Sequence, residues 1–197
     1  MKSLVDPGSV EYLNWLGRAI HECKLPATNR VRAAASCLAI AQDHHHAIVL
    51  LVDHHLYASA FALVRVAFEA YVRGEWLAAC ASEEQVESFV HGDEPPKFRV
   101  LLEELEQTEG FKRQVLSSIK AHAWDAMCAY THTGGLHIQR WNTSHAIEPG
   151  YEEAEVREVL DFAETVGSLA VIGVAKLAED VEAARAVLER FKQRKGQ

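Results

Sequence analysis

LYASAFALVRVAFEAYVRGEWLAACA, residues 56 to 81, is the stretch that decides the fold. It is apolar on almost every side of a helix, yet it carries Arg65, Glu69 and Arg73 at intervals of four residues. Side chains four residues apart lie on one helical face. Because a helix that is apolar all round belongs in the interior, the three charges should pair with one another or line a cavity. We therefore predict an internal ion-pair ladder, which becomes a site only if residues 132 to 145 fold over it.

The rest of the chain is predicted to form further helices around this stretch. The preceding segment runs from a cap at Thr28 or Asn29 to about Asp53, and its connection to residues 56 to 81 is so short that the two should form an antiparallel hairpin. Other helices are predicted at residues 9–24, opened by Ser9, at 82–90, capped by Ser82, at 97–108 and 111–132, and at 152–192, the last bent near Gly167 or Gly173. We predict one all-α domain over residues 1–197, an antiparallel bundle of about five to seven helices.

Residues 133 to 150 break this pattern. They contain Gly134-Gly135, a β-like Leu136-His137-Ile138 and the polar Asn142-Thr143-Ser144, and they keep no helical period. The glycine pair lacks the preceding strand and the lysine of a phosphate-binding loop, so it is predicted to end a helix. We expect an ordered loop of the kind that often carries function.

Composition excludes several classes of protein. The net charge of −8 argues against a broad nucleic-acid-binding face, which needs clustered Lys and Arg. No apolar run with a cleavage site follows the first Met, and the longest uncharged run, residues 165–175, is about half the length that crosses a bilayer. We expect a soluble cytoplasmic protein with no membrane partner. Its scattered cysteines are predicted to be reduced core residues: Cys23, Cys37, Cys80 and Cys128.

Histidine is unusually frequent, with eleven residues. The runs at residues 44–46 and 54–55 cannot chelate one ion from one face of a helix, because neighbouring side chains point about 100° apart, and we predict that they are solvated helix ends. His122, Asp125 and His132 share a helical stripe that could meet Glu69 across the bundle as a carboxylate–histidine metal site. A metal-dependent hydrolase is therefore one alternative, although no cofactor is expected from any recognised motif.

A second constellation lies in residues 140–145, RWNTSH, where Arg140 precedes His145 in the pattern R-x4-H. Together with LVRVAFEAYVRGEWL and YTHTGGLHIQRW, this segment resembles the HEPN (higher eukaryotes and prokaryotes nucleotide-binding) superfamily and related bacterial helical families. The resemblance covers residues 30 to 180. It departs from the family pattern at Trp141, where a polar residue is usual, and in placing the motif in a loop before the last helix.

The resemblance implies metal-independent RNA cleavage by a homodimer, with Arg and His from both subunits at a shared cleft. Arg140 would hold the scissile phosphate and His145 would move the proton, with His132 as an alternative proton carrier. These residues and Glu69 form the candidate catalytic set. The candidate binding residues are Arg65, Arg73, His137 and Trp141. Without such a role, the Arg140 guanidinium would stack on Trp141 and fasten the loop to the bundle.

Two classes of function remain open beside the metal hydrolase. The first is a HEPN-like ribonuclease toxin of a bacterial defence or toxin–antitoxin system, with RNA or an antitoxin-like protein as its partner. The second is a non-enzymatic helical module that binds a protein or a small ligand and whose interior charges only fix the packing. The two differ in whether Arg140, His145 and Glu69 converge.

Overall fold

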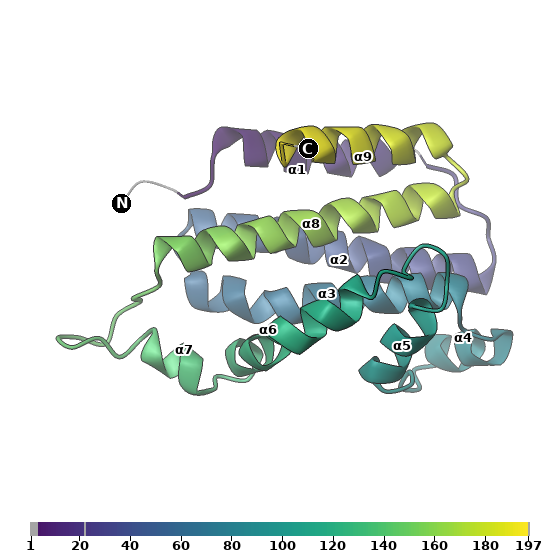
Figure 1. Cartoon of the computed structure of the whole chain (residues 1–197). Coiled ribbons are helices and arrows are strands. Elements are labelled where there is room, and N and C mark those ends of the chain that lie inside the picture. Colours follow the sequence, from purple (N-terminus) through teal and green to yellow (C-terminus); the bar gives the residue numbers. More distant parts are fainter. Residues whose placement is uncertain (1–3, 22, 197) are drawn as a thin grey trace.

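The structure, a computed structural model, describes residues 4–21 and 23–196 (Figure 1). Within these residues it contains nine helices and no β-strand, and so confirms the all-α prediction with more helices than expected. In chain order they are α1 (Pro7–Ile20), α2 (Asn29–Asp53), α3 (Tyr57–Ala79), α4 (Glu83–Val90), α5 (Phe98–Leu105), α6 (Val115–Thr131), α7 (Gly135–Gln139), α8 (Glu153–Leu177) and α9 (Val181–Arg194). No helix of the described part is long and apolar enough to cross a membrane.

The centre of the bundle is the predicted hairpin of α2 and α3, on which α8 packs. Figure 1 shows α1 and α9 as an outer layer beyond α8, while α6 lies on the opposite side against α3. Most of α3 is buried, as an all-round apolar helix requires, and Phe68, Val72, Trp76 and Leu77 are almost fully enclosed. The apolar composition of α3 thus places it in the interior.

Local signals set several helix ends as predicted. The hydroxyl of Thr28 accepts from the backbone N–H of Val31 at the start of α2. Ser82 and Gln85 form a reciprocal capping box at the start of α4. At α1, however, the cap is Asp6 rather than Ser9, because Pro7 occupies the first helical position and Ser9 donates its N–H to the Asp6 carboxylate.

The predicted single helix over residues 152–192 is wrong. The chain instead turns back after α8, where Glu179 adopts a left-handed conformation with φ of 56°, and α9 returns along α8. The reversal buries Val187 of α9 against Tyr12, Leu16, Val171 and Ile172. Burial of this apolar stripe favours two antiparallel helices over one long helix exposed to water.

The two glycines at which a bend was expected are instead points of close packing inside α8. A Cβ on Gly167 would lie 2.3 Å from Nδ1 of His45 in α2, and one on Gly173 would lie 2.7 Å from Glu75 of α3. The absence of a side chain at both glycines lets α8 approach the hairpin closely. They also correct the prediction for the first histidine run, because His45 is only 2% exposed and belongs to the core.

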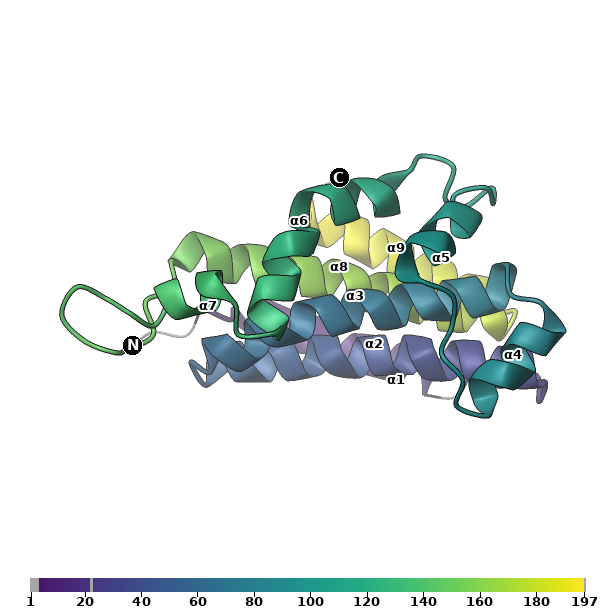
Figure 2. The ribbon, with the colours of Figure 1, turned by 90° about the horizontal axis from the view of Figure 1, so that it is seen from below.

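The segment predicted as a loop contains the short helix α7 in place of a β-like run. In the loop that follows, Asn142 and Ile147 form an isolated antiparallel β-bridge, and the chain then enters α8. Figure 2 shows α7 and this loop at the end of the bundle where α8 begins. Gly134 does follow the end of α6, as predicted, and its N–H donates to the carbonyl of Ala129.

The four cysteines are unpaired, as predicted. Cys37 is buried, and burial raises the pKa of its thiol, but Cys23, Cys80 and Cys128 are partly exposed rather than core residues.

Candidate functional site

The predicted ion-pair ladder on α3 is present. Nε of Arg65 donates to Oε1 of Glu69 at 2.8 Å, and Nη2 of Arg73 donates to Oε2 of the same carboxylate at 2.8 Å. Glu69 is 8% exposed, so both oxygens of a nearly buried carboxylate are satisfied within one helix. The ladder neutralises Glu69 and leaves one excess positive charge on this face.

The ladder extends to His132, one of the predicted proton carriers. Nη1 of Arg65 lies 2.7 Å from Nε2 of His132 at the end of α6. Because a guanidinium only donates, this imidazole nitrogen is the acceptor and carries no proton. The Arg65 guanidinium also lies 4.8 Å from the centre of the Trp124 ring. Four predicted residues, Arg65, Glu69, Arg73 and His132, thus form one connected group.

Arg140 lies elsewhere and is paired with Glu155. Its Nε donates to Oε2 of Glu155 at 2.8 Å and its Nη2 donates to Oε1, a two-point fork between α7 and α8. The hydrogen bonds lower the pKa of Glu155 and raise the pKa of Arg140. Arg140 thus pairs with Glu155 instead of stacking on Trp141 as the sequence suggested, and Trp141 is exposed.

The remaining catalytic candidate, His145, is exposed at the tip of the loop after α7. Among the described residues no hydrogen bond or ion pair joins its side chain to Arg140, His132 or Glu69, which bind other partners. Arg140, His145 and Glu69 therefore do not converge within one chain.

The proposed metal ligands do not gather either. Nδ1 of the exposed His122 lies 2.7 Å from the carbonyl of Ser118, and His132 is bound to Arg65. The part of the chain that the structure describes contains no group of three or more His, Cys, Asp or Glu side chains that could hold a metal ion. The stripe of His122, Asp125 and His132 thus shares a helix without forming a site.

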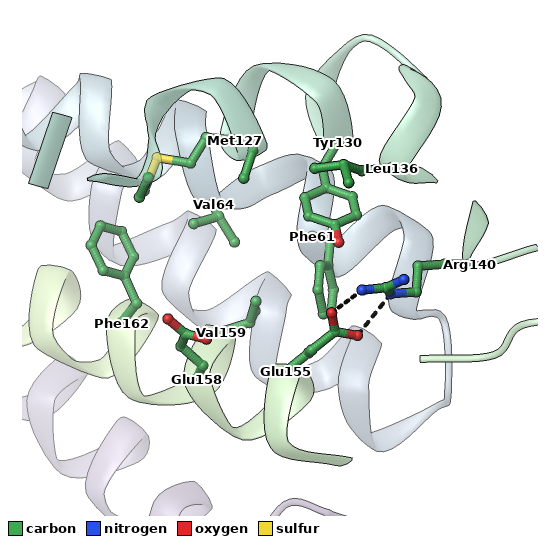
Figure 3. A pocket seen from close by; sticks show the side chains of 12 residues that line it. Phe61, Val64, Met127, Tyr130, Leu136, Arg140, Glu155, Glu158, Val159 and Phe162 are labelled. Atoms are coloured by element: carbon green, nitrogen blue, oxygen red, sulfur yellow. Dashed lines mark hydrogen bonds and ion pairs between the residues drawn. The ribbon is translucent and has the colours of Figure 1, made fainter. Parts of the chain in front are cut away.

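A cavity that the sequence did not reveal opens between α6 and α8. Both helices pack on α3, but they scarcely touch each other, so a gap remains above α3. The gap has a volume of about 300 Å³ and is mainly apolar. Figure 3 shows its principal apolar side chains, which come from three helices: Phe61, Val64, Met127, Tyr130, Val159 and Phe162.

Charged side chains lie at one end and at the mouth of this pocket. Figure 3 shows the Arg140–Glu155 fork beside Tyr130 and the Glu158 carboxylate one turn further along α8. Burial raises the pKa of the Tyr130 hydroxyl, and the negative charge of Glu155 raises it further. The pocket therefore combines an apolar body with a small polar rim, which is the usual composition of a site for a small molecule.

His137, predicted to bind a ligand, lies behind this polar end. It is 8% exposed, and its Nδ1 donates to the carbonyl of Tyr130 at 3.0 Å. Its Nε2 is then a bare acceptor, buried without a partner among the described residues. His137 packs against the Tyr130 ring and so supports the wall of the pocket.

The pocket residues of α8 have a sequence signal that was missed. Glu155, Glu158, Val159 and Phe162 are spaced three and four residues apart and so share one face. The acidic residues near the start of α8 can also be explained by their favourable interaction with the helix dipole, and the sequence alone favours this explanation. Only the facing positions of α6 and α7 show that this face lines a cavity.

A family model described as "Family of unknown function (DUF6988)" matches residues 38–194, which include every residue that lines the pocket. No curated protein and no solved structure matches the chain.

Proposed function

The chain belongs to this family of unknown function, DUF6988, whose model covers most of its length, and we propose that it acts by binding a small, largely apolar molecule in the pocket between α3, α6 and α8. The single observation that carries the proposal is the cavity of about 300 Å³ left between α6 and α8. Sites for small molecules typically begin near this size, at roughly 300 Å³.

The physical basis is the incomplete packing of apolar side chains. Phe61 and Val64 of α3, and Met127 of α6, are almost fully buried, whereas Tyr130 of α6 and Val159 and Phe162 of α8 remain partly exposed. A ligand that covers these partly exposed side chains removes apolar surface from water at about 25 cal/mol per Å². Binding is therefore expected to be driven by apolar contact, with the polar rim setting orientation.

The state of Arg140 favours this function over phosphate binding at the same place. A phosphate would have to replace Glu155 in a two-point fork and would meet the Glu158 charge beside it. An uncharged or apolar group can enter without breaking that pair. The polar end of the pocket can therefore receive an uncharged ligand with the Arg140–Glu155 pair intact.

Titration with N-phenyl-1-naphthylamine, a neutral dye that fluoresces in apolar surroundings, tests the proposal. Wild-type protein should bind the dye at one site, and Ala126→Phe, which fills the pocket from α6, should weaken binding at least about tenfold. The matched control is Ala121→Phe on the exposed face of the same helix, which should bind as the wild type does. Absence of dye binding to the wild type, or equal binding by both variants, would refute the proposal, provided that circular dichroism shows both variants folded.

RNA cleavage is a second candidate, and the contact between Arg65 and His132 favours it. The Nε2 lone pair of the exposed His132 accepts from Arg65 in this structure. If the guanidinium shifts onto a phosphate and stabilises it, the same lone pair becomes free to accept a proton from a ribose hydroxyl. In this arrangement His132 replaces His145 as the proton carrier. If the activity exists, purified wild-type protein cleaves RNA, His132→Ala abolishes cleavage and His145→Ala retains it. Cleavage lost only with His145→Ala would instead point to a shared cleft in a homodimer.

A further inference from the structure

The α8 side of the pocket holds more negative than positive charge. Glu155 and Glu158, three residues apart in α8, both line the pocket. Arg140 is the one cation among the described residues that line the pocket, and Glu155 occupies it with both oxygens. Glu158 forms no ion pair in the described part of the chain. One carboxylate at the mouth therefore remains uncompensated.

The Arg140–Glu155 pair acts on the Tyr130 hydroxyl with both signs of charge. Burial and then the charge of Glu155 raise the pKa of this hydroxyl, while the charge and the hydrogen bond of Arg140 lower it, so the pair adds no net charge at this end of the pocket. A carboxylate or phosphate on a ligand would therefore meet the uncompensated Glu158, and the one lining cation among the described residues is already paired with Glu155. A cation would be attracted, since like charges repel and opposite charges attract more strongly beside an apolar wall than in open water.

The aromatic side chains of the pocket also favour a cation over an anion. The rings of Phe61, Tyr130 and Phe162 come from α3, α6 and α8 and border the apolar body of the cavity. The face of such a ring carries partial negative charge and attracts an ammonium group within about 6 Å. Carboxylate and rings together match a molecule that is apolar along most of its length and cationic at one end.

We propose that the ligand is such a cationic amphiphile, an amine on an aromatic or aliphatic body, with the body in the pocket and the ammonium group against Glu158. This inference rests on the proposed binding function and names the chemical class of its ligand. Arg140 and Glu155 then form a neutral end wall of the site.

Three probes of matched shape separate charge from apolar contact: 4-phenylbutylamine, 4-phenylbutan-1-ol and 4-phenylbutanoate. Each is measured by displacement of N-phenyl-1-naphthylamine at low salt. The amine should bind about fivefold more tightly than the alcohol, and the carboxylate more weakly than both. In Glu158→Gln the amine should fall to the affinity of the alcohol, while the alcohol keeps its wild-type affinity.

Glu153→Gln is the matched control, because it removes the same charge from another face of α8, where Glu153 pairs with Arg157. It should keep the preference for the amine. Equal binding of amine and alcohol by the wild type, or a preference that survives Glu158→Gln, would overturn this inference while leaving ligand binding intact. Failure of the dye and all three probes to bind would instead refute the proposed function itself.

Discussion

His45 should make the protein sensitive to acid. Its imidazole is 2% exposed, lies against Gly167 of α8 and contacts Gln42 through Nδ1 at 3.3 Å. Burial first, and then the nearby charges of His46, Arg194 and Lys195, lower the pKa of His45 from 6.5 to about 3. The folded protein therefore keeps this imidazole neutral at pH values where an exposed one is protonated.

The magnitude follows from proton linkage. Between pH 6.5 and about 3 the unfolded chain binds a proton at His45 and the folded chain does not, so the free energy of unfolding falls as pH decreases. Each unit of that window costs about 1.4 kcal/mol, which gives a loss of about 2 kcal/mol between roughly pH 7.5 and pH 5. This loss is a substantial fraction of the stability of a typical domain.

Urea denaturation of the wild type, His45→Gln and His46→Gln at these two pH values measures the loss. His45→Gln is expected to be less stable than the wild type at the higher pH, because the core packing changes, but to lose about 2 kcal/mol less on acidification. The exposed neighbour His46 controls for loss of a histidine, and His46→Gln should retain the wild-type loss. The reasoning fails if His45→Gln and the wild type lose the same free energy.

Three further substitutions test the packing by urea denaturation. Glu69→Ala leaves two partly buried guanidinium groups unpaired and should cost about 2 kcal/mol; a cost below about 0.5 kcal/mol would show that the ladder contributes little. Gly167→Ala forces a methyl group onto His45 and should cost about 1–3 kcal/mol, whereas Gly17→Ala, with nothing within 4 Å of the added Cβ, should be neutral or stabilising. Burial raises the pKa of Glu75, so this residue favours the folded state at low pH and loses that effect as pH rises and its carboxyl ionises. Glu75→Gln should therefore raise the free energy of unfolding at neutral pH. A difference between variant and wild type that did not grow with pH would contradict this.

Much of the helical framework was predictable because its signals are local. The apolar composition of residues 56 to 81 identified α3 and its charged ladder. Thr28 and Ser82 marked helix starts through side chains within three residues of the groups that they cap. The errors arose where a distant partner decided the outcome. The start of α9 does have a local signal that was missed, because the Asp180 side chain caps it. That α9 folds back on the bundle, however, is decided by the burial of Val187 against α1 and α8, a distant contact.

The candidate site shows the same division. The sequence placed Arg65, Glu69 and Arg73 in one ladder, because intervals of four residues fix their geometry within a single helix. It gave no means to foresee that Arg140 would pair with Glu155 rather than approach His145.

The sequence by itself therefore determined the helical class, the central hairpin and the ladder on α3, since each follows from periodicity and capping over a few turns. Only the tertiary structure decided that His45 is buried, that His132 reaches Arg65 and that α6 and α8 leave a cavity between them. The physical reason is that helix periodicity fixes directions within one helix, whereas contacts and gaps between helices depend on how every element of the bundle packs at once.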